Sequence, residues 1–456
     1  MFHSTISSAL LQDFKANLHG ELTGPNDEGY DSARRVWNGM IDRYPALIVH
    51  CADISDVTRA IQFAERQHLP VAVRSGGHSF AGSGTCDGGI VIDLSPMKRV
   101  QIDPVKRTAW VQAGLTLGEF IRETQAFGLA SPVGTASETG LAGLTLGGGL
   151  GWLMGKYGLT IDNLLAVDIV TADGRVLRAS ATEHADLFWG VRGGGGNFGI
   201  VTAFEFQLHP VGPLLAGMVV HPLDRMREIL NFYREFTRTA PDELTIGTGL
   251  ATMPNGLLRA ALVLCYCGPL EEGERLIEPV RTFGSPLVDA IRPMSYLELI
   301  SMLDAFVPRG RHYYSKACSL KHLNDEALKM IIDYGSASPS PLTQVILQHV
   351  HGAASRVDPA GTAFALREEH YPLQIMTAWD EDTASDTYIQ WTRALWKAME
   401  PFAVDGTYIN FLGSDEEGPA PVRASYGANY ERLVALKNGY DPTNFFHINQ
   451  NIKPTL

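Results

Sequence analysis

Short apolar runs alternate with amphipathic stretches along residues 45–210 of the chain. The segment after the first run predicts a helix that continues through Gln67, and Asp53 or Ser55 is suited to cap its N-terminus. Runs rich in β-branched residues and bounded by turn residues predict strands at 46–49, 69–73, 89–94, 108–113 and 165–171. Asp173-Gly174 predicts a tight turn between two strands, because this pair adopts positive φ readily. The pattern favours a mixed α/β lobe.

The pattern changes after Pro210 and Pro213, which places a domain boundary near residue 212. Beyond it, a helix is predicted at 225–238, among long strands that include 258–267 and 342–350. Residues 424–437 predict one further helix. The aromatic and amide residues of 445–452 are unusual for a disordered tail, so this segment is expected to dock on the first lobe.

Composition narrows the class of protein. With 456 residues, 45% of them hydrophobic, the chain can fill two or three lobes. A net charge of −13 and the lack of a long basic run argue against a nucleic-acid partner. The N-terminus does not resemble a secretion signal, and no segment is suited to span a membrane. Five scattered cysteines fit a reducing compartment, so a cytoplasmic protein is predicted.

The segment from Arg74 to Ser79 is the first candidate for chemistry. It is Arg-Ser-Gly-Gly-His-Ser, directly after an apolar strand. Gly76 and Gly77 allow a sharp turn or a close approach to a ligand, and the turn fixes the position of His78. From these residues alone, His78 is either a hydrogen-bonded loop histidine or a residue held against a cofactor.

Two glycine clusters favour the cofactor. Residues 140–151 contain six glycines, and residues 193–199 contain five. Glycine backbone amides can surround a pyrophosphate without a basic side chain, although tight interior turns are the alternative explanation. Neither cluster has the placement of a Rossmann fingerprint, and no Walker lysine follows. The expected ligand is large and phosphorylated.

Four ordered motifs carry a family resemblance. They are residues 74–79, Gly-Gly-Gly-Leu-Gly-Trp-Leu at 147–153, the glycine-rich segment 187–202, and the segment 429–446. Together they resemble the berberine-bridge-enzyme-like branch of the vanillyl-alcohol-oxidase flavoproteins, over nearly the whole chain. The resemblance implies an α+β fold with a two-lobed PCMH-type FAD-binding domain at 1–212, completed by 420–456. Residues 213–419 would form the substrate domain, an antiparallel sheet covered by helices.

The resemblance also implies a covalent flavin. His78 matches the histidine that bonds to FAD, whereas Ala136 stands where many relatives have a second, cysteine link, so one link is expected as in bacterial monocovalent members. Thr139 matches the position that controls oxygen access, and its small side chain should obstruct oxygen less than leucine would. The other residues expected to bind FAD are Arg74, Ser75, Gly76, Gly77, Ser79, Gly143, Gly147, Gly148, Asn197, Gly199, Ile200, Val201, Tyr408, Asn449 and Asn451.

Flavin oxidation needs a group that assists proton removal near the reacting carbon. The family's Tyr-x-Asn strand matches Tyr408 and Asn410, which would share one face of a strand. Tyr408 would be the base or the hydrogen-bond partner of the base. Phe411 replaces a second tyrosine or histidine found in many relatives, so a two-group base is doubtful and Phe411 would wall the pocket.

Further candidates lie on the predicted substrate strands. One of His349 and His351 would face the substrate, although each is also explained as an ordinary surface or core histidine. His351 is kept as a catalytic candidate, together with Gln374, which lies near the family's catalytic acid. Residues 368–370 are expected to form a solvated turn, and no metal-ligand spacing stands out.

The sequence therefore predicts an FAD-dependent oxidase. It would take hydride from a CH-OH or CH-NH carbon of a small organic substrate, with oxygen as acceptor and hydrogen peroxide as product. The alternatives are a dehydrogenase of the same fold that uses another acceptor, and a flavin-binding protein whose catalytic site has decayed. A monomer or homodimer is expected.

Overall fold

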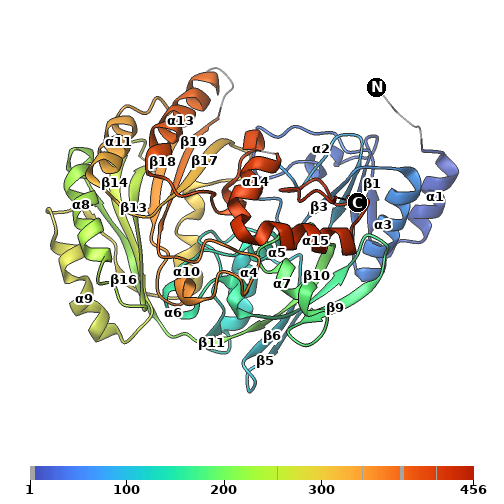
Figure 1. The fold of residues 1–456 in the computed structure, drawn as a ribbon, viewed down its shortest axis with the longest axis horizontal. Coiled ribbons are helices and arrows are strands. Elements are labelled where there is room, and N and C mark those ends of the chain that lie inside the picture. The colour runs from blue at the N-terminus through green and yellow to red at the C-terminus, as the bar shows by residue number, and fades with distance from the viewer. Residues whose placement is uncertain (1–5, 254, 341, 381–384, 417, 456) are drawn as a thin grey trace.

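The computed structural model describes residues 6–253, 255–340, 342–380, 385–416 and 418–455. A small four-stranded sheet and a small five-stranded sheet come from the first half of the chain, and a large eight-stranded sheet comes from the middle (Figure 1). The first small sheet has the order β1-β2-β4-β3. In it β2 and β3 pair parallel with β4, and β1 pairs antiparallel with β2. Its strands are β1 (Glu21–Thr23), β2 (Leu47–His50), β3 (Val71–Arg74) and β4 (Ile90–Asp93).

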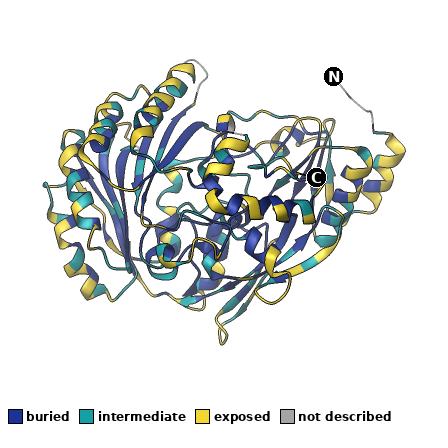
Figure 2. Ribbon diagram, in the orientation of Figure 1, coloured by how far each residue is buried: buried dark blue, intermediate teal, exposed yellow. Residues whose placement is uncertain are grey.

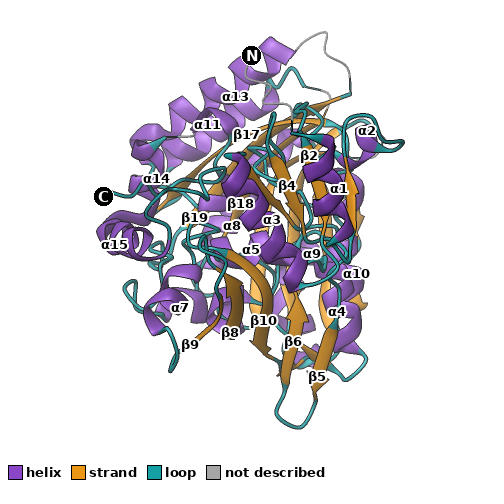
Figure 3. Cartoon of the chain, turned by 90° about the vertical axis from the view of Figure 1, so that its right-hand side faces the viewer, coloured by secondary structure: helices purple, strands orange, loops and turns teal. Residues whose placement is uncertain are grey.

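The second small sheet is antiparallel, in the order β5-β6-β10-β8-β9, and Figure 3 shows these strands next to one another. The turn between β8 and β9 contains Gly174 at φ +79°, so the predicted tight turn is confirmed. Asp53 caps α3 (Ile54–Gln67) by accepting hydrogen bonds from the backbone N–H groups of Ser55 and Asp56, as predicted. The strands are β5 (Val100–Asp103), β6 (Thr108–Gln112), β8 (Leu164–Val170), β9 (Val176–Ser180) and β10 (Ile200–Gln207).

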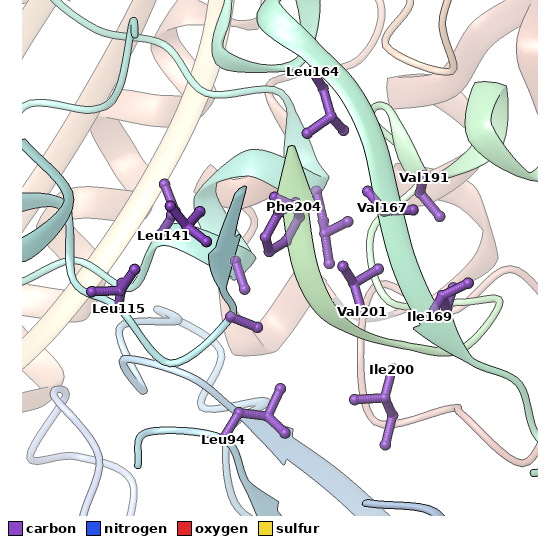
Figure 4. Packing of buried hydrophobic residues seen from close by; sticks show 14 of the residues in the cluster. Leu94, Leu115, Leu141, Leu164, Val167, Ile169, Val191, Ile200, Val201 and Phe204 are labelled. Atoms are coloured by element: carbon purple, nitrogen blue, oxygen red, sulfur yellow. The ribbon is translucent and has the colours of Figure 1, made fainter. Parts of the chain in front are cut away.

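Apolar side chains from separate segments pack against this second sheet. Figure 4 shows Phe204 and Val201 of β10, Val167 and Ile169 of β8, and Leu141 of a short helix meeting in one cluster. On β8, Val167 and Ile169 lie on either side of the more exposed Asp168, as alternation along a strand requires, whereas a register shift between Val201 and Ala203 interrupts the alternation on β10. The other helices and strands of this region are α1 (Ser8–Ala16), α2 (Tyr30–Ala33), α4 (Leu117–Gln125), β7 (Leu129–Ala130), α5 (Leu141–Gly147), α6 (Met154–Tyr157), α7 (Ala185–Val191) and β11 (His209–Pro210).

The large sheet is antiparallel, in the order β15-β12-β14-β13-β18-β19-β17, with β16 also paired to β12. One face is covered by helices, and its strands are buried beneath them (Figures 1 and 2). The strands are β12 (Leu214–His221), β13 (Leu244–Thr252), β14 (Leu258–Tyr266), β15 (Val288–Asp289), β16 (Arg292–Met294), β17 (His312–Leu320), β18 (Leu342–Gln348) and β19 (Tyr371–Trp379). The helices of this region are α8 (Met226–Thr237), α9 (Leu270–Thr282), α10 (Tyr296–Ser301), α11 (Asp325–Ser336), α12 (Ala353–Arg356) and α13 (Ser385–Met399).

Two local predictions were wrong. The helix expected at 424–437 is two helices, α14 (Pro419–Tyr426) and α15 (Tyr430–Tyr440), because Gly427 takes φ +49° and ends the first. The expected solvated turn at 368–370 contains a buried residue. His370, only 5% exposed, pairs through its backbone with Val350 beyond the end of β18.

The C-terminal tail docks on the first lobe, as expected. The backbone N–H of Ile452 donates to the side-chain oxygen of Asn197 at 2.9 Å, and Phe446 and Ile452 join the core of that lobe. This contact brings the end of the chain next to the second glycine cluster.

Within the described ranges, every helix is too short or too polar to cross a bilayer.

Candidate active site

A cavity of about 440 Å³ lies between the uncovered face of the large sheet and the loops of the first lobe. This volume is within the range of cofactor and substrate sites. Most of the residues predicted to bind FAD or substrate line it. These are Arg74, Ser75, Gly76, Gly77, His78, Ser79, Thr139, Gly143, Gly199, Ile200, Val201, Gln374, Tyr408, Asn410 and Asn449.

The turn after β3 presents His78 to this cavity. Gly77 takes φ +66°, and a Cβ on Gly76 would come within 2.4 Å of the Gly140 nitrogen, so both positions require glycine. The His78 ring stacks on Trp37 with ring centroids 4.3 Å apart, and Trp37 stacks in turn on Tyr313 of β17 at 3.9 Å. The stack fixes the plane of the imidazole.

Burial lowers the pKa of His78 to about 4, and the positive charge of Arg309 adds to this shift. The imidazole is therefore neutral at pH 7, the state in which a ring nitrogen carries an available lone pair. Sequence reasoning missed Trp37 and Arg309. Neither lies in a motif, and both meet His78 only through the fold.

The two glycine clusters adjoin one another, because the backbone N–H groups of Gly193 and Gly195 both donate to the Leu146 carbonyl. The glycines divide into two kinds. A Cβ on Gly151 or Gly194 would collide with backbone, so these glycines allow tight packing. A Cβ on the cavity-lining Gly143 would meet nothing within 4 Å. Tight packing therefore explains some of these glycines, whereas Gly143 lies beside open space in the cavity.

Tyr408 and Asn410 do not lie on a strand, which corrects that prediction. Residues Ile409–Phe411 form a turn of 3₁₀ helix, closed by the bond from the Phe411 N–H to the Tyr408 carbonyl at 2.8 Å. The tight turn brings the Asn410 amide back onto the Tyr408 hydroxyl, to which it donates at 2.9 Å. The N–H of Gly149 donates to the same oxygen at 2.9 Å. Phe411 packs edge-on against the Tyr408 ring and lines the cavity.

Both of these bonds use the phenol oxygen as an acceptor, so they leave the Tyr408 hydroxyl proton available to a ligand. Burial raises the pKa of Tyr408, although the bonds from Gly149 and Asn410 oppose the shift. Tyr408 is thus protonated at neutral pH and suited to donate a hydrogen bond.

Comparisons with known proteins agree with this geometry. Residues 45–180 match the family described as FAD binding domain, and residues 407–453 match berberine and berberine-like proteins. Over 98% of both chains, the sequence is 33% identical to an FAD-linked oxidoreductase of Dictyostelium discoideum. The chain belongs to the berberine-bridge-enzyme-like family. It is therefore an FAD-dependent oxidoreductase, and the predicted family and α+β fold are confirmed.

Solved structures of this berberine-bridge-enzyme-like family have the same fold. The 6-hydroxy-D-nicotine oxidase of Arthrobacter nicotinovorans gives a TM-score of 0.88 at 30% identity, covering 96% of this chain and 98% of that chain. The BBE-like 1 protein of Physcomitrella patens also gives 0.88, at 25% identity, covering 98% and 99%.

The cavity fits the FAD that this family binds. Buried polar atoms without a partner among the described residues include Trp152 Nε1 and Asn449 Oδ1, and both residues line the cavity. Buried polar groups are normally hydrogen-bonded, so these atoms are suited to a polar ligand. Arg74 also lines the cavity, but its guanidinium donates to the Asp93 carboxylate at 2.8 Å, so its charge is already paired.

Four predicted cofactor residues lie behind the cavity surface. Asn197 donates to the Gly194 carbonyl at 2.9 Å and so shapes the second glycine loop. A Cβ on Gly147 would come within 2.3 Å of the Asn410 side chain, and one on Gly148 would approach Phe364, so these glycines leave room for other side chains. The Asn451 Oδ1 is buried without a partner among the described residues.

The large sheet contributes the remaining lining. Gln374 of β19 faces the cavity and donates weakly to Ser315 at 3.4 Å. His351 does not reach the cavity lining, because it follows the end of β18 and bonds through Nε2 to the Leu244 carbonyl at 2.9 Å. Its neighbour His349 is buried against it and pairs with Glu369. The sequence analysis also missed Gln344 and Gln348, which strand alternation places on the same side as Ile346.

Proposed function

We propose that this protein is an FAD-linked oxidase that takes hydride from a CH-OH or CH-NH carbon of a small organic molecule. The FAD would be held covalently through His78 alone, with residues 1–212 and 420–456 as its domain and residues 213–419 as the substrate domain. The observation that carries this proposal is that His78 and Tyr408 line the same cavity.

His78 is suited to attachment because its imidazole is neutral and held in place by Trp37. Ala136 also lines the cavity, and its methyl side chain has no group able to form a second bond. Arg74, Ser75, Ser79 and Asn449 would contact the cofactor, and Asn197 would shape the loop around it.

Bound FAD would accept the hydride and pass its electrons to oxygen, which yields hydrogen peroxide. In this reaction Tyr408 would donate a hydrogen bond to the substrate's oxygen or nitrogen and so hold the reacting carbon in line. Gly149 and Asn410 fix the phenol in position for this. Gln374 would contact substrate. Thr139 lines the cavity with a small side chain, which favours oxygen over another acceptor.

The covalent link is tested by acid precipitation of the purified protein. We expect a yellow pellet, and a colourless pellet from His78→Ala with flavin released or absent. Val105→Ala, at an exposed position, is the matched control and should keep its colour. A colourless pellet from the unchanged protein would refute the covalent bond.

Oxidase activity is tested by mixing the chemically reduced protein rapidly with oxygen. Fast reoxidation with release of hydrogen peroxide is expected. Slow reoxidation, with rapid electron transfer to an artificial acceptor, would instead support a dehydrogenase. Flavin that stays oxidised under anaerobic incubation with alcohols, sugars, amines and phenols would support a decayed catalytic site.

A further inference from the structure

The cavity has almost no charged side chains. No aspartate or glutamate appears among the described residues that line it. Arg74 is the one lysine or arginine among them, and its charge is already paired with Asp93. A charged substrate that moved from water into this cavity would therefore meet no counter-ion there. Such a transfer costs several kcal/mol per ion.

The polar groups on the sheet side of the cavity are neutral amides. Gln344 and Gln348 are four residues apart on β18, with Ile346 midway between them, and Gln374 of β19 pairs with Ile346. Gln344 is anchored by donating to the Phe306 carbonyl at 3.0 Å. The Gln348 Oε1 is buried and has no partner among the described residues. An amide offers both donors and an acceptor, which suits hydroxyl and carbonyl groups.

The surroundings of these amides are apolar. Met218, Val263, Ile346 and Met376 come from β12, β14, β18 and β19, and Phe411 also lines the cavity. On β13 the residues paired with Gln348 and Ile346 are Gly247 and Gly249, and the lack of a side chain at these two positions leaves room above the sheet.

We propose that the substrate is an uncharged, largely apolar alcohol whose oxygen atoms are bound by Gln344, Gln348 and Gln374, and that amines and carboxylates are excluded. This rests on the proposed oxidase function and narrows it to CH-OH substrates. Most amines carry a positive charge at neutral pH, and the described residues that line this cavity include no acid to pair with it. In the reaction the C–H and O–H bonds break and a carbonyl forms. The hydride passes to FAD, the hydroxyl proton goes to water, and the two electrons finally reduce oxygen to hydrogen peroxide.

The test measures binding rather than turnover. The flavin-containing protein is titrated anaerobically with benzyl alcohol, benzylammonium and benzoate, which share one ring skeleton, and the flavin absorbance change gives each Kd. A second set with a larger ring system consists of 2-naphthalenemethanol, 2-naphthylmethylammonium and 2-naphthoate. Neutral members are expected to bind at least about tenfold more tightly than their charged partners. Equal or tighter binding of an ammonium or carboxylate, or no binding by either alcohol, would overturn the proposal.

Gln348→Glu sharpens the test by adding one carboxylate to the cavity. It should raise the affinity for benzylammonium about tenfold and weaken benzyl alcohol binding. Gln101→Glu makes the same charge change at an exposed position on β5 and should alter neither affinity. If Gln348→Glu does not fold, Gln348→Met retains the volume without the amide and should weaken binding of the alcohols. Unchanged affinities in the variant that folds would overturn the role of Gln348.

The oxidase proposal and the substrate-class proposal can be refuted independently of each other. If alcohols bind selectively but are not oxidised, the oxidase proposal fails while the uncharged ligand class stands. If an amine binds tightly and is oxidised with release of peroxide, the oxidase proposal stands and the substrate class is wrong.

Discussion

Replacement of Lys437 by methionine should destabilise the protein strongly. Lys437 of α15 and Asp441 are both 0% exposed, and the Nζ lies 2.6 Å from the carboxylate. The same ammonium donates to the carbonyls of Asn197 at 2.8 Å and Phe446 at 2.9 Å. All three of its donors are thus used, and they join the helix, the second glycine loop and the tail.

The loss of stability in Lys437→Met comes from the carboxylate that the substitution leaves unpaired. Methionine fills a similar volume but leaves the Asp441 charge buried with only backbone partners, the N–H groups of Phe445 and Phe446. Removing one partner of a buried ion pair costs about 3–5 kcal/mol. That is a large part of the about 5–15 kcal/mol by which a typical domain is stable.

Urea unfolding, followed by tryptophan fluorescence and by flavin release, measures this cost. Lys437→Met should lower the unfolding midpoint markedly, whereas Lys453→Met, at an exposed tail position, should change stability by less than about 0.5 kcal/mol. Adding Asp441→Asn should recover at least about 1 kcal/mol, because the double variant removes the unpaired charge. Costs that simply add in the double variant would refute the ion-pair argument.

Two further predictions concern Tyr408 and His349. Tyr408→Phe keeps the pocket shape but removes the donated hydrogen bond, so steady-state kcat/KM should fall by roughly 10²-fold while flavin content is unchanged. Turnover equal to that of the unchanged protein would remove Tyr408 from the reaction. Burial, with the nearby charge of His351, lowers the pKa of His349 to about 4, so between pH 6.5 and 4 the unfolded chain binds more protons than the folded one. Stability should therefore fall as pH falls through this window, by on the order of 1–3 kcal/mol, and unfolding midpoints measured against pH should show a smaller loss in His349→Gln.

Local features of the fold could be predicted from sequence because they depend on neighbouring residues. The Asp53 cap and the turn at Gly174 each need only a few adjacent side chains. The break at Gly427 also had a local signal, a glycine inside a helical pattern, but glycine is tolerated within helices as well as at their ends. The distinction depends on its φ, which surrounding packing sets.

The candidate site was harder to predict because its residues meet through the fold. Trp37 orients His78 from a segment 41 positions away in the chain. Alternation along β18 shows that Gln344 and Gln348 share a face, but not whether that face is covered by helices or opens to the cavity. The spacing of Tyr408 and Asn410 suits a strand and a tight turn equally, and the structure has the turn.

We infer that the second glycine loop helps an acidic protein to bind the phosphates of FAD without a free cation among the described residues that line the cavity. A phosphate is attracted by backbone N–H groups and repelled by carbonyl oxygens. Side chains donate hydrogen bonds to three carbonyls of this loop. Asn197 donates to Gly194 O, Asn449 donates to Gly196 O, and Lys437 donates to Asn197 O. The N–H groups of Gly193, Gly194 and Gly195 already donate to the Leu146 and Gly190 carbonyls, so the amides that this loop can offer to a ligand begin at Gly196. We infer that Asn197 acts through loop geometry, and that Lys437 serves cofactor binding although it does not line the cavity.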